Sequence, residues 1–207
     1  MINVAFTREG RAHSYSIKRF EELFQIQYLS HLEYANWEVE RLIPKYCKRA
    51  ERHDRISALS LWLGHLHGKE LDRAAIPPIT IRWIHEKIGY GIFADAPISP
   101  WQFVGEYTGL LRRRRLLFPD VNDYCFMYPR KWLSTKVFTI DSKGHGNFTR
   151  FINHSDTPNL ESLCVFHRGV FRVILRACEA IPAGSELTYD YGDVYWLERK
   201  KLPPNSF

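Results

Sequence analysis

The sequence contains few cysteines and no long apolar run. Four cysteines among 207 residues show neither Cys-x-x-Cys nor Cys-x-Cys spacing, which favours a reducing compartment and small buried thiols over disulfides or a zinc cluster. No stretch approaches the roughly 18 uncharged apolar residues that a membrane span needs. The first ten residues lack the apolar core of a Sec signal peptide. We therefore expect a protein that is cytoplasmic where it is made.

Neither sign of charge dominates the sequence. The 29 basic and 23 acidic residues give a net charge of +6, which suits an enzyme as well as a nucleic-acid binder. Hydrophobic residues make up 45% of the chain and charged residues 25%, and this balance excludes a disordered or collagen-like protein. The length is sufficient for one domain with an appendage.

The chain changes character near residue 76. Before that point, apolar residues recur at helical spacing, which predicts a helical N-terminal region over residues 1–75. Pro77 and Pro78 then interrupt the pattern and indicate a linker. One predicted helix face comprises Phe20, Leu23, Phe24 and Tyr28. A second comprises Leu59, Trp62, Leu63 and Leu66.

Beyond the linker, short β-rich runs alternate with glycine and proline. No helix long enough for a βαβ crossover separates these runs, so the pattern favours small, mostly antiparallel sheets. Arg168-Gly169 between two apolar runs predicts a hairpin turn. The predicted strands are Ile79–Ile84, Gly91–Ala94, Gln102–Thr108, Val137–Asp141, Leu160–His167, Val170–Cys178 and Glu186–Tyr191.

Three segments of the β-rich part contain candidate functional residues: 87–94, 150–160 and 181–192. The first has a Gly-x-Gly triplet, which brings backbone close to a ligand or forms an ordinary turn. The second has an Asn-His-Ser cluster, which is also typical of an ordered loop. The third places two tyrosines at positions i and i+2 of a strand, on one face, where they contribute to a core or to catalysis.

Taken together, these segments resemble the SET-domain protein lysine methyltransferases over residues 79–192. Gly89-Tyr90-Gly91 is similar to the family's cofactor turn, and Tyr124 is similar to its active-site aromatic residue. The segments RFINHS, from Arg150, and ELTYDY, from Glu186, are similar to the two that form the family's pseudoknot. The resemblance implies a mostly β fold with some α structure, a β-clip with a pseudoknot.

The resemblance also implies a chemistry. The methyl donor would be S-adenosyl-L-methionine, and the acceptor a lysine ε-amine in a protein. The implied catalytic residues are Tyr191, Tyr189 and Tyr124. The implied cofactor-binding residues are Gly89, Tyr90, Gly91, Tyr124, Arg150, Asn153, His154, Tyr191 and Trp196.

Some of these roles have alternatives. Arg150 fits a brace for the knot as well as a ligand contact, and Trp196 either stacks on adenine or packs on the helical region. In the family, the residue two before the catalytic tyrosine tunes how many methyl groups are added. Tyr189 at that position implies mono- or dimethyl-lysine as the main product.

The sequence departs from the family pattern in its cysteines. Asp156 stands where many members have a zinc-binding cysteine, no cysteine follows Gly192, and no cysteine-rich segment precedes the SET region. We therefore expect no metal, and residues 193–207 to form a lid-like tail. These features resemble the short SET proteins of intracellular bacteria, notably the chlamydial type, which act as bacterial effectors on chromatin.

That resemblance implies histones or histone-like basic proteins as substrates. The alternatives are a non-histone target such as a ribosomal protein, or a catalytically silent SET module that binds a partner. Residues 112–115 are four arginines, either a solvated loop or a contact for an acidic partner or for DNA that carries the substrate. We further expect a homodimer. Export by a non-Sec route into a host cell and its nucleus is an alternative to a cytoplasmic location.

Overall fold

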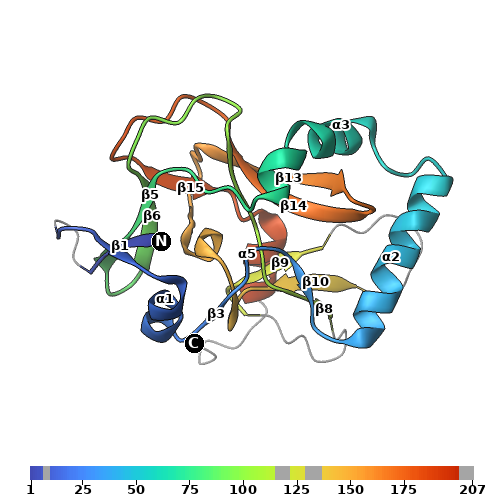
Figure 1. Cartoon of the computed structure of the whole chain (residues 1–207), viewed down its shortest axis with the longest axis horizontal. Coiled ribbons are helices and arrows are strands. Elements are labelled where there is room, and N and C mark those ends of the chain that lie inside the picture. Colours follow the sequence, from blue (N-terminus) through green and yellow to red (C-terminus); the bar gives the residue numbers. More distant parts are fainter. Residues whose placement is uncertain (7–9, 115–121, 129–136, 201–207) are drawn as a thin grey trace.

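Three sheets organise the computed structural model, which describes residues 1–6, 10–114, 122–128 and 137–200 (Figure 1). The largest sheet has the order β2-β1-β5-β6-β15-β13-β14-β7, and β12 pairs with β15 beside this path. Its strands are β1 (Ile2–Ala5), β2 (His13–Tyr15), β5 (Ile79–His85), β6 (Gly89–Ala94), β7 (Phe103–Glu106), β12 (Asn153–His154), β13 (Leu160–His167), β14 (Val170–Ala177) and β15 (Glu186–Tyr189).

Two smaller sheets complete the strand-rich fold. One has the order β4-β8-β10-β9, and the other pairs β11 with β3. Their strands are β3 (Gln27–Tyr28), β4 (Glu33–Tyr34), β8 (Leu110–Arg113), β9 (Cys125–Met127), β10 (Phe138–Asp141) and β11 (His145–Gly146). Strand β9 therefore lies at the edge of its sheet.

The helices lie around these sheets. Figure 1 shows α1 near β1 on one side of the molecule, and α2 and α3 on the other side. Polar side chains cap three of them, because Ser16, Asn36 and Ser57 each accept a hydrogen bond from a first-turn N–H. The helices are α1 (Ile17–Phe24), α2 (Trp37–Arg52), α3 (Ala58–Leu66), α4 (Gly68–Asp72), the short 3₁₀ helix η1 (Phe148–Phe151) and α5 (Asp193–Lys200).

The predicted strands beyond residue 76 are confirmed, with small shifts at their ends. The bounds of β13 are those predicted. Arg168 and Gly169 both have positive φ, 49° and 78°, as a tight hairpin between right-twisted strands requires. Most neighbours in the largest sheet run antiparallel, but β12 and β13 pair with β15 in parallel.

The first 75 residues contain the expected helices, but they also contain four strands that join the sheets of the later region. Strand β1 pairs with β5, β3 with β11, and β4 with β8, all in parallel. The prediction that Tyr28 belongs to a helix face is wrong, because Gln25 adopts φ 52° and ends α1, and Tyr28 follows in β3. The domain boundaries at residues 75, 79 and 192 stay predictions.

The predicted apolar face of α3 is mostly exposed. Leu63 is buried, whereas Leu59 and Trp62 are each 57% exposed and Leu66 is 48% exposed. The cause is the close approach of α3 to β13, since a Cβ at Gly64 would collide with the backbone oxygen of Phe166. The sheet therefore covers the Leu63–Gly64 side of the helix.

The main core lies under β5, β6 and β15, where Ile81, Ile92 and Leu187 are fully buried. Among the four free cysteines only Cys47 is buried, so the prediction of four buried thiols is wrong for the half-buried Cys125, Cys164 and Cys178. No helix within the described residues is long and apolar enough to cross a bilayer.

Candidate active site

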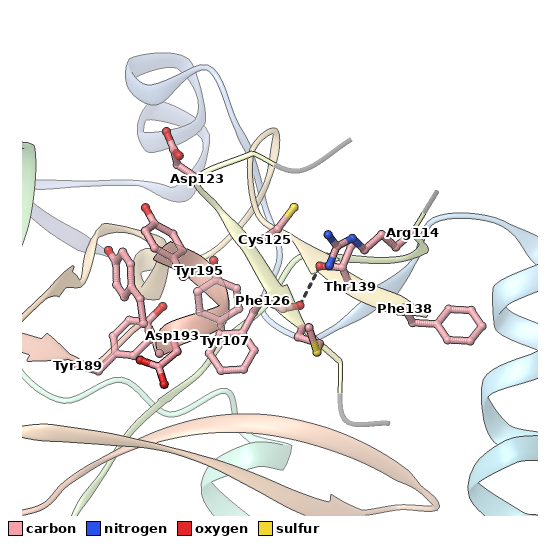
Figure 2. A pocket seen from close by; sticks show the side chains of 13 residues that line it. Tyr107, Arg114, Asp123, Cys125, Phe126, Phe138, Thr139, Tyr189, Asp193 and Tyr195 are labelled. Carbon is pink, nitrogen blue, oxygen red and sulfur yellow. Dashed lines mark hydrogen bonds between the residues drawn. The ribbon is translucent and has the colours of Figure 1, made fainter. Parts of the chain in front are cut away.

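A pocket of about 220 Å³ opens where β9, β10 and the end of β15 meet (Figure 2). Two predicted site residues, Tyr189 and Tyr191, lie in its wall. Among the described residues, those that line it are Tyr107, Arg114, Asp123, Cys125, Phe126, Met127, Phe138, Thr139, Tyr189, Tyr191, Gly192, Asp193 and Tyr195. The tyrosine rings gather on one side of the pocket, and Arg114 and Phe138 lie on the other.

The tyrosine rings of this pocket pack against one another. The ring centroids of Tyr189 and Tyr191 are 4.8 Å apart, and those of Tyr191 and Tyr195 are 4.5 Å apart. Burial raises the pKa of Tyr107 and of Tyr189 well above the usual value for a phenol. These two hydroxyls therefore remain neutral hydrogen-bonding groups at any physiological pH.

Backbone contacts fix the position of Tyr191. Its hydroxyl donates to the carbonyl of Ile152 at 2.9 Å, and its N–H donates to Nδ1 of His154 at 3.2 Å. Since Nδ1 accepts, the neutral ring carries its proton on Nε2, which lies 3.1 Å from Oδ1 of Asp156. The tyrosine thus connects the pocket to the strand that carries Asn153 and His154.

The predicted cofactor residues assemble beside the pocket. Strand β12 pairs with β15 so that Asn153 lies opposite Thr188 and His154 opposite Tyr189. Nδ2 of Asn153 donates to the carbonyl of Tyr90 at 3.2 Å, which joins β12 to β6. The two segments that the resemblance assigned to the pseudoknot therefore lie side by side, with the Gly-x-Gly turn next to them.

Gly89 and Gly91 of that turn are required for different structural reasons. Gly89 has φ 79°, and a Cβ there would meet nothing within 4 Å. A Cβ on Gly91 would lie 2.6 Å from Cδ1 of Ile84 and 2.7 Å from Oε1 of Glu186. Gly89 therefore supplies a turn beside open space, whereas Gly91 makes room for side chains of the protein itself.

Trp196 on α5 contacts the same group of residues. Its ring lies edge-on to His154 and to Tyr195, with centroid distances of 4.9 Å in both cases. The ring is 42% exposed, so part of it remains accessible beside His154. A contact of Trp196 with a cofactor stays a prediction, and residues 201–207 of the predicted lid lie outside the described part of the chain.

Arg150 acts as a brace in this structure. Its Nε donates to the carbonyl of Ser142 at 2.8 Å, and Nη2 donates to that of Lys143 at 3.2 Å. The guanidinium also lies 4.0 Å from the ring centroid of Tyr124. Tyr124 is not among the residues that line the pocket, whereas its neighbours Asp123, Cys125, Phe126 and Met127 are.

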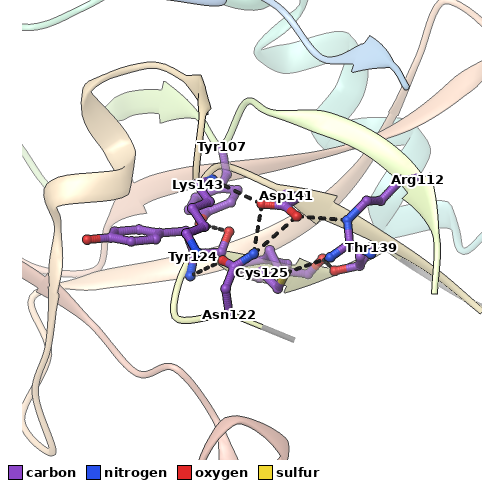
Figure 3. A network of polar contacts seen from close by, with 9 residues as sticks. Tyr107, Arg112, Asn122, Tyr124, Cys125, Thr139, Asp141 and Lys143 are labelled. Atoms are coloured by element: carbon purple, nitrogen blue, oxygen red, sulfur yellow. Dashed lines mark hydrogen bonds and ion pairs between the residues drawn. The ribbon is translucent and has the colours of Figure 1, made fainter. Parts of the chain in front are cut away.

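A polar network centred on Asp141 holds the segment that carries Tyr124 and Phe126 (Figure 3). Oδ2 of Asp141 accepts from Nε of Arg112 at 2.7 Å, and Nδ2 of Asn122 donates to both carboxylate oxygens at 3.0 and 3.1 Å. Oδ1 of Asn122 in turn accepts from the N–H of Tyr124 at 2.9 Å. The network joins β8 and β10 to the residues that precede β9.

The charge of Asp141 is stabilised inside this network. Burial raises its pKa, but hydrogen bonds from the Lys143 N–H, Asn122 and Arg112 outweigh burial and hold the pKa below its usual value. Arg112 is thus part of an internal ion pair on β8, with 17% of its side chain exposed. The interpretation of residues 112–115 as a solvated loop is wrong at Arg112, and Arg115 lies outside the described residues.

Comparison with known proteins identifies this arrangement. Residues 89–192, half of the chain, match the family described as the SET domain. The chain belongs to the SET domain family. The match begins at the first glycine of the cofactor turn and ends just after Tyr191.

Two curated relatives and one solved structure show how this SET domain compares with others. The chain is 30% identical over 181 residues to histone-lysine N-methyltransferase EZH2 of Chaetomium thermophilum, covering 81% of this chain and 12% of that protein. It is 36% identical over 121 residues to N-lysine methyltransferase KMT5A-A of Danio rerio, and the match covers 55% of this chain and 35% of that protein. A structure of apo ctPRC2 with two mutations in Ezh2 aligns with a TM-score of 0.51 at 28% identity, covering 62% of this chain and 17% of that one.

The chain therefore spans about a third or less of the length of these relatives. Within its own SET domain, no cluster of three or more His, Cys, Asp or Glu side chains in the described residues could hold a metal ion. Asp156, at the position of the expected zinc cysteine, lies against His154 at 3.1 Å.

Several residues of this SET site were missed by sequence reasoning. Tyr107, Phe126 and Tyr195 line the pocket, and Asp141 and Glu186 hold residues around it. Glu186 stood inside the ELTYDY segment that the resemblance used, and Tyr107 stood inside the predicted strand Gln102–Thr108. Their roles depend on which way each side chain points, and no spacing rule provides that direction.

Proposed function

We propose that this chain is an S-adenosylmethionine-dependent protein lysine N-methyltransferase that acts on histones or histone-like basic proteins. The observation that carries the proposal is the junction at Tyr191. This residue lines the aromatic pocket and is also hydrogen-bonded to Ile152 and His154, next to Asn153. A lysine in the pocket and a cofactor along β12 would meet at this junction.

The residues along β12 and β6 suit this cofactor. Tyr90, Asn153 and His154 are half-buried, so each has a face that a ligand can reach. Gly89 leaves open space at the turn, and the exposed part of Trp196 offers an aromatic surface for a base. When bound, S-adenosylmethionine supplies a methyl group on a sulfonium cation.

The pocket suits a neutral amine. Free lysine has a pKa of about 10.4, yet only the unprotonated amine has a lone pair that can attack. A pocket lined by Tyr107, Phe126 and Tyr189 disfavours the ammonium form, because aromatic rings replace water around the charge. Aligning the amine in such a pocket supplies much of the rate acceleration in a reaction of this kind.

The histone substrate is supported by the names of relatives, since EZH2 is a histone-lysine methyltransferase. A non-histone target, such as a ribosomal protein, remains the second candidate, because KMT5A-A is named only as an N-lysine methyltransferase. The presence of Tyr191, Asn153 and His154 in one connected group argues against a catalytically silent module.

Incubation with labelled S-adenosylmethionine and either core histones or a proteome extract tests the proposal. We expect label in a basic protein, mainly as mono- or dimethyl-lysine because Tyr189 places a hydroxyl beside the pocket. Label that appears only in non-histone bands would move the substrate to the second candidate. Absence of label, with calorimetry showing no cofactor binding, would contradict the proposal.

We also propose that the protein is of the short bacterial, chlamydial-like type and contains no zinc. The support is Asp156 in place of a cysteine and the lack of cysteine after Gly192. A bacterial effector of this type would leave the cytoplasm by a non-Sec route and act in a host nucleus. One zinc ion per chain in elemental analysis would contradict the proposed absence of zinc. Exclusive retention in the bacterial cytoplasm would contradict the proposed export.

We propose a homodimer as well, on the basis of α3. This helix exposes Leu59, Leu61, Trp62 and Leu66, each at least 45% exposed. Light scattering should give twice the monomer mass of 24.5 kDa, and a monomer mass at every concentration would contradict the proposal.

Any contact of residues 112–115 with DNA that carries the substrate would involve the exposed Arg113 rather than the ion-paired Arg112.

A further inference from the structure

The side-chain amide of Asn153 has one defined orientation. Nδ2 donates to Oε1 of Glu186 at 2.9 Å and to the carbonyl of Tyr90 at 3.2 Å. Both partners are acceptors without a proton to give, one a carboxylate oxygen and the other a backbone oxygen. The two N–H groups of the amide are therefore both used inside the protein.

The opposite orientation is excluded by the same two partners. Rotating the amide by 180° would place Oδ1 of Asn153 against the Glu186 carboxylate and the Tyr90 carbonyl, so that acceptor would face acceptor. Of the two partners, the carboxylate imposes the stronger preference, because hydrogen bonds to a charged group are roughly twice as strong as neutral ones.

Glu186 is itself held in place. It begins β15 opposite Phe93 of β6, and its own carbonyl accepts from Nδ2 of Asn159 at 2.8 Å. A Cβ on Gly91 would lie 2.7 Å from Oε1 of Glu186 and 3.0 Å from Nδ2 of Asn153, so the pair packs directly on the backbone of β6. Strands β6, β12 and β15 therefore together hold the hydrogen bond between Asn153 and Glu186 in place.

The consequence for a ligand concerns the atom that stays available. With both N–H groups used, the half-buried Asn153 offers Oδ1, which is an acceptor only. The amino-acid end of S-adenosylmethionine carries an ammonium group, which donates, and a carboxylate, which accepts. Oδ1 can bind the ammonium and cannot bind the carboxylate.

We propose that Glu186 is a positioning residue that fixes the amide of Asn153 with its carbonyl oxygen toward the cofactor, and thereby makes the cofactor's α-ammonium group a requirement for tight binding. This inference rests on the proposed function, since it assumes a cofactor along β12. The negative charge of Glu186, one hydrogen bond away, also attracts the ammonium group.

The test compares two ligands with two proteins by calorimetry. The ligands are S-adenosylhomocysteine and its analogue in which hydrogen replaces the α-amino group. The variant is Glu186→Gln, whose side chain has both a donor and an acceptor and so no longer opposes the reversed orientation of Asn153, which the Tyr90 carbonyl alone then disfavours. The matched control is Glu179→Gln, an exposed glutamate beyond β14.

We expect loss of the amino group to weaken binding to the wild type and to Glu179→Gln by about tenfold or more, as for a hydrogen bond to a charged group. In Glu186→Gln that ratio should fall severalfold, while thermal unfolding stays cooperative. An unchanged ratio in Glu186→Gln would overturn the inference and leave the proposed function intact. No binding of S-adenosylhomocysteine by the wild type would overturn both.

A second pair of variants tests the same hydrogen bond from the side of Asn153. Asn153→Asp places two carboxylates together and should weaken S-adenosylhomocysteine binding at least tenfold. Adding Glu186→Gln to Asn153→Asp restores a donor against an acceptor and should recover at least severalfold of that loss. A double variant that binds no better than Asn153→Asp alone would overturn the inference.

Discussion

The two halves of the candidate site are held by different means. On the cofactor half, β6, β12 and β15 belong to the largest sheet, and the backbone pairing of these strands sets the positions of Tyr90 and Asn153. On the substrate half, Phe126 lies on β9, a three-residue edge strand, and the side chains around Asp141 hold the residues that precede it. Backbone pairing tolerates change of side chains better than a polar network does, so substrate selection should vary more readily than cofactor binding.

Removing the hydroxyl that joins the two halves should have the largest effect. Tyr191→Phe loses the hydrogen bond to Ile152 and the oriented hydroxyl at the junction. We expect turnover to fall about a hundredfold or more, as for the loss of one positioned polar group. Transfer of labelled methyl groups measures this, with Tyr15→Phe, which is not among the pocket-lining residues, as the control. Near-normal turnover in Tyr191→Phe would contradict its role.

The next effect should be confined to the cofactor half. Gly91→Ala would push against Glu186 and Asn153, and we expect the dissociation constant for S-adenosylhomocysteine to rise about tenfold or more. Gly144→Ala is the matched control, because a Cβ there meets nothing within 4 Å and its φ is not positive. Equal affinities in the two variants would show that packing at Gly91 does not position the site.

A smaller effect should be confined to the substrate half. Asp141→Asn removes the negative charge to which Arg112 and Asn122 donate hydrogen bonds, so β9 should lose its fixed position. We expect KM for the protein substrate to rise severalfold, with cofactor affinity unchanged. Steady-state kinetics with each substrate varied provides the measurement. Asp72→Asn serves as the control, since Asp72 pairs with His167 and Arg168 and does not line the pocket. A change in cofactor affinity in Asp141→Asn, with KM for the protein substrate unchanged, would contradict the assignment of Asp141 to the substrate half.

The smallest effect should appear in the product rather than in the rate. Tyr189→Phe removes a buried hydroxyl from the pocket wall and leaves space that a methylated amine can occupy. Mass spectrometry should show a shift toward trimethyl-lysine with little change in turnover. Trimethyl-lysine as the main wild-type product, or an unchanged distribution in the variant, would exclude this role for Tyr189.

The same division separates what the sequence predicted from what it did not. Asn153, His154 and Tyr191 were predicted together from the family resemblance, and they lie together because β12 pairs with β15 and the N–H of Tyr191 donates to His154. The role of Phe126 rather than Tyr124 in the pocket wall was not predictable, because Tyr124 precedes β9 and its ring packs on the guanidinium of Arg150, a residue distant in the sequence. The N-terminal strands β3 and β4 have two residues each, too short for any periodicity.

The long spacing of the contacts around Asn153 has a consequence for how the protein is made. Asn153 bonds to Tyr90, 63 residues earlier, and to Glu186, 33 residues later. Contacts of such separation form slowly, and during synthesis the last partner leaves the ribosome long after the first. Most of the chain is therefore translated before the amide of Asn153 has both of its hydrogen-bond acceptors. In an experiment on nascent chains, the onset of cofactor binding would therefore report the completion of folding rather than its beginning.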